Sequence, residues 1–212
     1  MWKQGDSVCI IGATQSGKTG FARDLLSYRQ YAIMLVTKRD DYLWSGWRTV
    51  NRQRDIDPLI APKWRLWPAR WDLMTGQFVD ALQQVWLEKN WCIYLDEMYY
   101  LQALGLEKPI TQLLTQGATN HITVVVGMQR PSRVSRFALS EPRYIVSFRL
   151  GDGRDLETVR EWTSREFART IRGLDRYTAA ILDKVTGDIE TGTRRDIERL
   201  FGPRAPAEPA MR

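Results

Sequence analysis

The residues from Gly12 to Thr19 read G-A-T-Q-S-G-K-T, which fits the phosphate-binding P-loop pattern G-x-x-x-x-G-K-T. The glycines of such a loop let the backbone curl until successive N–H groups point at one phosphate. We expect Lys18 to reach the β- and γ-phosphates of ATP and the Thr19 hydroxyl to coordinate Mg²⁺. The residues expected to contact the nucleotide are Gly12, Ala13, Thr14, Gln15, Ser16, Gly17, Lys18 and Thr19.

The segments on both sides of this motif favour a P-loop over a chance match. Val8–Ile11 is a short apolar run rich in β-branched residues, which is typical of a buried parallel strand. Gly20–Leu26 has apolar residues at helical spacing, and the N-terminus of this helix would add partial positive charge near the phosphates. Strand, glycine loop and helix therefore follow one another in the order that phosphate binding requires.

Two adjacent carboxylates form the second candidate motif. Asp96 and Glu97 follow the apolar run Trp91–Leu95, which predicts a strand. We expect Asp96 to help hold Mg²⁺ opposite Thr19, and Glu97 to polarise the attacking water. A strand that simply ends at the solvent is the alternative, and the P-loop earlier in the chain favours the catalytic interpretation. A water-activating carboxylate also favours a hydrolase over a small-molecule kinase.

Gln129 is the third candidate, because it ends the apolar run that begins at Ile122, and Pro131 then stops the strand. An amide at that strand tip would lie beside the γ-phosphate, where it would sense hydrolysis by exchanging a hydrogen bond between phosphate and water. An ordinary glutamine at a strand end is the alternative. His121 is the only histidine, and we expect it in a loop or at a strand edge, since no catalytic partners surround it.

The rest of the pattern predicts an α/β fold with a mainly parallel central sheet, flanking helices and a C-terminal hairpin. Further strands are expected at 31–37 and 144–148, helices at 76–89, 107–117 and 155–170, and a hairpin within 174–192. Ser164 is a point where the last helix could be interrupted or a second one could start. We expect one domain over residues 1–201 and a flexible tail over 202–212.

Residues 42–72 are expected to form an irregular excursion, since Pro58, Pro62 and Pro68 disfavour long helices. Tryptophans and arginines alternate in this segment, with one short strand expected around 64–67. Aromatic rings among arginines can stack on bases and bind phosphates. Tryptophans that fill the core, with arginines on a solvated face, are the alternative and the commoner arrangement.

The composition suits one large ordered domain, with 212 residues, 43% hydrophobic residues and a net charge of +6 that permits an acidic polymer as partner. Lys184 is the only lysine after Lys108, and this arginine bias fits phosphate contacts and codon bias equally well. Cys9 and Cys92 lie in apolar runs, so we expect no disulfide framework and no metal cluster. Because we see no signal peptide or membrane-length apolar run, we expect an intracellular, reducing environment.

The order of the P-loop, the acidic pair and the glutamine-ended strand resembles the FtsK/HerA superfamily of DNA-pumping ATPases. In that family a Thr-Gln-Arg-Pro run carries the sensor glutamine, and here Met128 replaces the threonine before Gln129-Arg130-Pro131. The compact length is most similar to the genome-packaging ATPases of tailless viruses with internal membranes. The resemblance covers roughly residues 7–150 and implies a RecA-like P-loop NTPase fold.

One departure from this family concerns the arginine that neighbouring subunits usually donate. The family carries it in a basic turn just before the glutamine-bearing strand, but here Thr115–His121 contains no arginine. We therefore expect the arginine to come from elsewhere, with Arg154 as the first choice and Arg149 as the second. An ordinary salt bridge is the alternative for either residue.

The resemblance implies that the chain hydrolyses ATP to move double-stranded DNA, independent of sequence, into a preformed viral capsid. It further implies a ring of five or six copies, docking to a capsid-vertex or membrane protein, and a location in the host cytoplasm or on the virion. Basic loops at 46–54 and 130–136 are the first candidates for contact with the DNA backbone. Two alternatives stay open: a P-loop nucleotide or nucleoside kinase, which the acidic pair and the Gln-Arg-Pro run disfavour, and a slow nucleotide-gated assembly switch.

Overall fold

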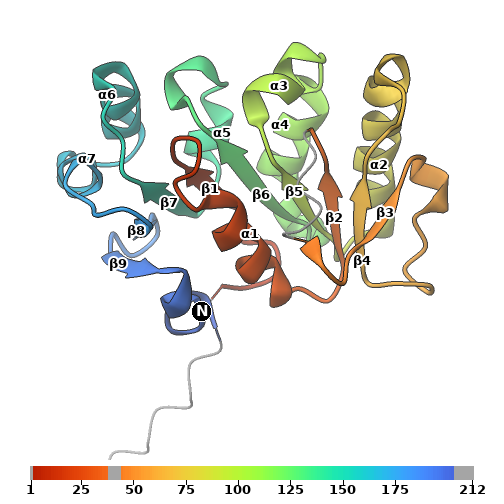
Figure 1. Cartoon of the computed structure of the whole chain (residues 1–212), viewed down its shortest axis with the longest axis horizontal. Helices are drawn as coiled ribbons and strands as arrows, with labels where there is room; N and C mark the ends of the chain where they lie inside the picture. The colour runs from red at the N-terminus through yellow and green to blue at the C-terminus, as the bar shows by residue number, and fades with distance from the viewer. Residues whose placement is uncertain (1, 38–43, 203–212) are drawn as a thin grey trace, which may run out of the picture.

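The computed structural model describes residues 2–37 and 44–202. Within these ranges a nine-stranded sheet runs through the molecule in the order β3-β4-β2-β5-β6-β1-β7-β8-β9 (Figure 1). The strands from β3 to β7 are parallel to their neighbours, and β8 and β9 are added antiparallel at one edge. The strands are β1 (Val8–Ile11), β2 (Ala32–Leu35), β3 (Arg48–Val50), β4 (Lys63–Leu66), β5 (Cys92–Leu95), β6 (Thr123–Met128), β7 (Tyr144–Phe148), β8 (Thr178–Asp183) and β9 (Ile189–Thr193).

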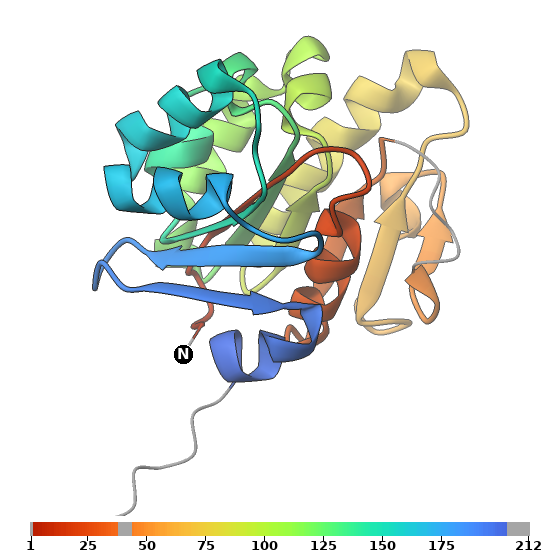
Figure 2. The same cartoon turned by 60° about the vertical axis from the view of Figure 1, so that its left-hand side comes forward.

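Helices cover both faces of this sheet, because successive strand residues point alternately into two cores. Cys9 and Ile11 face the core covered by α2 to α7, whereas Val8 and Ile10 face the core covered by α1 and α8. Figures 1 and 2 show α1 and α8 on the side of the sheet opposite the other helices. The helices are α1 (Lys18–Ser27), α2 (Met74–Glu88), α3 (Met98–Ala103), α4 (Glu107–Gln116), α5 (Phe137–Ser140), α6 (Gly153–Trp162), α7 (Arg165–Arg172) and α8 (Ile197–Phe201). The predicted α/β fold with its C-terminal hairpin is confirmed.

The segment expected to be irregular is more regular than its sequence predicts. β4 pairs with β2 and β3 pairs with β4, so the segment extends the parallel sheet by two strands. β4 is the short strand expected near 64–67, but β3 was not predicted, because Arg48 and Thr49 are exposed and give no apolar run. Trp44 and Trp64 are buried while Trp71 is 83% exposed, so the tryptophans divide between core and surface. Residues 42 and 43 lie outside the described residues.

The helix predicted over 155–170 is in fact two helices, α6 and α7. Ser164 caps the second helix, since its hydroxyl accepts a hydrogen bond of 3.0 Å from the Phe167 N–H. α3 and α5 were not predicted, because helices of six and four residues are too short to show a periodic apolar pattern. Of the tail expected to be flexible, residues 203–212 lie outside the described residues. In the described part of the chain, no helix has the length and apolar character needed to cross a membrane.

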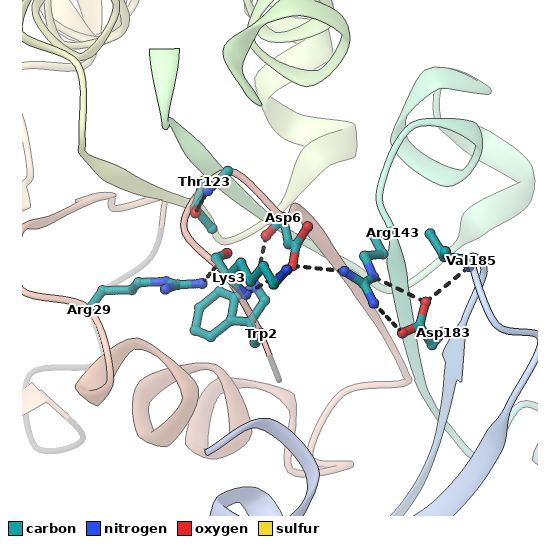
Figure 3. A network of polar contacts seen from close by, with 9 residues as sticks. Trp2, Lys3, Asp6, Arg29, Thr123, Arg143, Asp183 and Val185 are labelled. Atoms are coloured by element: carbon teal, nitrogen blue, oxygen red, sulfur yellow. Dashed lines mark hydrogen bonds and ion pairs between the residues drawn. The ribbon is translucent and has the colours of Figure 1, made fainter. Parts of the chain in front are cut away.

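A polar network fastens the amino edge of the sheet, where the parallel strands begin (Figure 3). Arg143 precedes β7 and donates to both carboxylate oxygens of Asp183, at 2.7 and 3.1 Å, and to Asp6 at 3.2 Å. Because Asp6 precedes β1 and Asp183 ends β8, one guanidinium ties three strand ends together. Beside it, the Arg29 guanidinium lies 3.4 Å from the centroid of the Trp2 ring.

Candidate active site

The residues predicted to bind the nucleotide or act in catalysis meet at the carboxyl edge of the sheet, opposite the polar network. The P-loop joins β1 to α1, Asp96 and Glu97 follow β5, and Gln129 follows β6. Since β5, β6 and β1 are adjacent parallel strands, their carboxyl ends lie side by side. Arg149 follows β7 at the same edge and Arg154 lies in the first turn of α6, and both are exposed.

The two outer glycines of the P-loop are required by close packing. Gly17 has a φ of 106°, and a Cβ there would lie 3.3 Å from the Phe148 ring. A Cβ on Gly12 would lie 2.6 Å from the Ser16 hydroxyl and 2.9 Å from the Phe148 Cβ. Any side chain at these positions would therefore deform the loop. Glycine at both positions keeps the loop backbone open toward a ligand.

Lys18 and Ser16 give the loop the polar groups that a phosphate requires. The Lys18 ammonium donates to the carbonyls of Gly12 at 2.7 Å and Ala13 at 3.1 Å, so it is held against the inside of the loop. The buried Ser16 hydroxyl makes no hydrogen bond to any residue that the structure describes. An ammonium, an orphaned hydroxyl and a curled backbone in one loop fit a ligand with many acceptor oxygens, as the P-loop motif predicts.

Asp96 is held in place by two residues that the sequence analysis did not single out. Its carboxylate is buried and accepts a hydrogen bond of 2.8 Å from the Tyr94 hydroxyl. Gly127, on the neighbouring strand, leaves room for this pair, since a Cβ there would lie 2.6 Å from the Asp96 carbonyl oxygen. The two-residue alternation of a strand, which puts Tyr94 and Asp96 on the same face, is the signal that could have found this pair.

A chain of hydrogen bonds joins the P-loop to the second carboxylate. The Thr14 hydroxyl donates to the Gln129 side-chain oxygen at 2.8 Å, and the Gln129 amide nitrogen donates to the Glu97 carboxylate at 2.7 Å. Gln129 is thus in contact with both the phosphate-binding loop and the residue expected to activate water. The contact with Thr14 was not predicted, because a P-loop motif specifies backbone geometry and not this side chain.

The turn after Gln129 is clamped to α6. Arg130 forms ion pairs with Asp155 at 2.8 Å and Asp152 at 3.0 Å, and the Ser132 hydroxyl donates to Asp155 at 2.6 Å. Asp155 is 1% exposed, and Asp152 caps α6 by accepting backbone N–H groups, which lower the pKa of its carboxyl. Arg130 therefore holds the turn and its glutamine in place.

Thr19 and Asp96 fit a Mg²⁺ ion that is completed by phosphate oxygens, because Mg²⁺ commonly takes only one or two protein carboxylates. Across residues 2–37 and 44–202, no cluster of three or more histidine, cysteine, aspartate or glutamate side chains could hold a metal on its own. Cys9 and Cys92 are both buried. Burial raises the pKa of both thiols, to about 12 for Cys92, which keeps them protonated.

Comparison with known proteins agrees with this arrangement. No family model matches the chain. It is 28% identical over 159 residues to the DNA packaging ATPase P9 of Enterobacteria phage PRD1, an alignment that covers 72% of this chain and 67% of that protein. The fold is similar to the genome packaging NTPase B204 of Sulfolobus turreted icosahedral virus 2 in complex with AMP, with a TM-score of 0.71, 14% identity, and coverage of 88% and 96% of the two chains.

A second structural neighbour lies outside the viral proteins. VirB4 of Thermoanaerobacter pseudethanolicus superposes with a TM-score of 0.63 and 11% identity over 88% of each chain. These likenesses confirm the predicted RecA-like P-loop fold and the predicted resemblance to viral genome-packaging ATPases. The individual site residues remain assigned from the motifs and from the geometry above.

Proposed function

We propose that this chain, which is similar to viral DNA packaging ATPases in both sequence and fold, hydrolyses ATP to drive double-stranded DNA into a viral capsid. The observation that carries this proposal is the contact chain Thr14–Gln129–Glu97, which links a P-loop to a carboxylate. A chain that only bound phosphate would not need a base there. Structures of the B204 protein contain AMP, AMPPCP and ATP-gammaS, which supports ATP as the nucleotide here.

The chain's own side chains have distinct roles in this proposal. The P-loop backbone and Lys18 bind and orient the triphosphate, while Glu97 accepts the proton of the attacking water. Gln129 holds the Glu97 carboxylate and changes partners as the phosphate leaves. A bound Mg²⁺, held by Thr19 and Asp96, would supply charge neutralisation at the phosphates.

Assembly would complete the site. We propose that Arg154, or else Arg149, enters the site of a neighbouring subunit in a homo-oligomeric ring, because each is exposed at the carboxyl edge where a neighbour could dock. Ring size, five or six copies, follows from the family resemblance. Basic loops at 46–54 and 130–136 would bind double-stranded DNA through its phosphates. The ring would work in the host cytoplasm and dock to a capsid-vertex or membrane protein.

ATP turnover with and without double-stranded DNA tests this proposal. We expect DNA to stimulate phosphate release, and DNA binding to weaken strongly between low and moderate salt. Lys18→Ala should abolish both ATP binding and turnover, whereas Lys108→Ala, an exposed lysine in α4, should change neither. Phosphate transfer to a nucleoside acceptor in place of water would instead identify a kinase, and ATP binding with negligible turnover would identify a switch.

A further inference from the structure

The side of the P-loop opposite the acidic pair is bordered by the end of the C-terminal hairpin. Tyr177 immediately precedes β8, and its ring lies 3.4 Å from the position that a Cβ on Gly17 would occupy. Arg194 immediately follows β9, and its guanidinium lies 3.2 Å from the position of a Cβ on Gly20. Since Thr178 pairs with Thr193, both side chains extend from the same end of the hairpin, which reaches α1 in Figure 2.

Tyr177 has features that the packing of the fold does not require. Its side chain is 51% exposed, and its backbone has a φ of 65°, in the left-handed region that aromatic residues rarely adopt. The Arg176 guanidinium lies 4.8 Å from the centroid of the Tyr177 ring. An exposed aromatic ring in a costly backbone conformation, beside a phosphate loop and next to a cation, calls for a functional explanation.

The sheet order fixes the direction in which a nucleotide must lie. The groups expected to act on the terminal phosphate follow β5 and β6, on one side of β1, whereas the hairpin begins beyond β7 on the other side. A triphosphate bound in the P-loop with its γ-phosphate toward Glu97 therefore directs its nucleoside toward Tyr177. The base is a flat π-system, and an exposed aromatic ring is the surface on which such a group stacks.

We propose that Tyr177 is the platform on which the purine base of the bound nucleotide stacks, with Arg176 beside it. This inference rests on the proposed ATPase function and deepens it, because it assigns the nucleoside subsite. Arg194 is a positioning residue: it forms an ion pair with Asp24 of α1, which fastens the end of the hairpin next to the P-loop. Phe148 is 3% exposed, so it fills the space beneath the loop and leaves the exposed ring of Tyr177 to meet the base.

Calorimetric affinities for ATP and for inorganic tripolyphosphate, both with Mg²⁺, separate the base contact from the phosphate contacts. Tyr177→Asn removes the ring and suits a left-handed backbone, so the variant should fold. We expect its affinity for ATP to fall about tenfold and its affinity for tripolyphosphate to stay the same. Stacking of a base on an aromatic ring commonly contributes about a tenfold factor in affinity. Tyr177→Phe should retain the affinity for ATP within about twofold.

Tyr28→Ala is the matched control, because it removes an exposed tyrosine at the opposite end of α1 and should leave both affinities unchanged. Equal weakening of ATP and tripolyphosphate by Tyr177→Asn, or no weakening of ATP, would overturn the inference while leaving the ATPase proposal standing. Failure of the wild-type protein to bind ATP would instead overturn both, and the two failures are therefore distinguishable.

Discussion

The two edges of the central sheet differ in the partners of their charged side chains. At the amino edge, Arg143 bonds to the carboxylates of Asp183 and Asp6, so opposite charges compensate one another (Figure 3). At the carboxyl edge, Arg130 is paired with Asp155 and Asp152 in the same way. Lys18, however, also donates to two loop carbonyls, and Glu97 also accepts from the Gln129 amide. These contacts with neutral groups hold Lys18 and Glu97 in the positions that phosphate binding and water activation would need.

This difference indicates that the charged groups at the amino edge serve stability, whereas Lys18 and Glu97 at the carboxyl edge serve chemistry. The hydrogen bond from Arg143 to Asp183 raises the pKa of the guanidinium, and although burial opposes it, bonding to Arg143 and to backbone N–H groups lowers the pKa of Asp183. Burial similarly raises the pKa of the neighbouring Tyr144 to about 12, which keeps its hydroxyl neutral. The charges at the amino edge are thus committed to the fold, and changes there should affect unfolding before they affect catalysis.

The largest expected effect is at the carboxyl edge, in the variant Glu97→Gln. Removing the base should lower kcat at least about 100-fold, because a positioned general base typically contributes that much or more. ATP affinity and the melting temperature should change little, since the amide keeps the shape of the side chain. Single-turnover phosphate release measures the loss, with Glu107→Gln, an exposed residue in the first turn of α4, as control. Full turnover in Glu97→Gln would show that the base is another residue.

The next largest effect should come from the amino edge, where Asp183→Asn removes one partner of Arg143. The free energy of unfolding should fall by about 1–3 kcal/mol, as expected when a partly buried charge loses its partner, while kcat stays unchanged. Urea denaturation and steady-state turnover measure the two quantities. Asp72→Asn is the control, because its ion pair with Arg70 is exposed and should contribute little. A loss of kcat without a loss of stability would contradict the division between the two edges.

The lowered pKa of Asp183 predicts how the free energy of unfolding depends on pH. Because the pKa of Asp183 is lower in the folded state than in the unfolded state, its contribution is present above the unfolded pKa of about 3.9 and is lost as the pH falls through the folded value. The stability difference between wild type and Asp183→Asn should therefore be constant from pH 7 to about 5 and shrink below about pH 4. Denaturation curves across this range measure it, and a difference that grows on acidification would contradict the assigned direction.

The smallest effect should follow from Thr14→Val, which keeps the shape of the P-loop side chain but removes its hydrogen bond to Gln129. We expect kcat to fall about threefold to tenfold, in line with the loss of one hydrogen bond, and ATP affinity to stay the same. Thr115→Val is matched to it, since that hydroxyl bonds to carbonyls of its own helix. Unchanged kcat in Thr14→Val together with a large loss in Gln129→Ala would mean that the glutamine acts without the loop contact.

Local patterns predicted most of the fold, and they supplied the candidate site residues from a P-loop motif and from strand ends that the sequence marks with apolar runs. Lys18 was proposed from the motif, and Asp96 and Gln129 from the strand ends. Two other residues that were missed, Asp155 and Tyr177, act across long sequence separations. Asp155 holds the turn after β6, and Tyr177 reaches Gly17, but neither relation leaves a periodic signal within one segment of sequence.

The fold showed the same limit. β3 escaped prediction because an edge strand with exposed side chains lacks the apolar alternation from which strands are read. In contrast, Trp64 and Leu66 of β4, two positions apart and both buried, gave a recognisable strand pattern. Prediction thus succeeded for segments whose burial restricts the residue types. It failed for segments that are restricted only by contacts with residues distant in sequence.

The clamp between Arg130 and Asp155 has a mechanical consequence. It joins the amino end of α6 to the turn that carries Gln129, because neither can shift relative to the other without breaking the ion pair between Arg130 and the buried Asp155 carboxylate. A push on α6 from an adjoining molecule would therefore be transmitted to the glutamine, and through it to the alignment of Glu97. A mechanical force on α6 would then change the rate of ATP hydrolysis in the site. The coupling would require a displacement of only about one hydrogen-bond length.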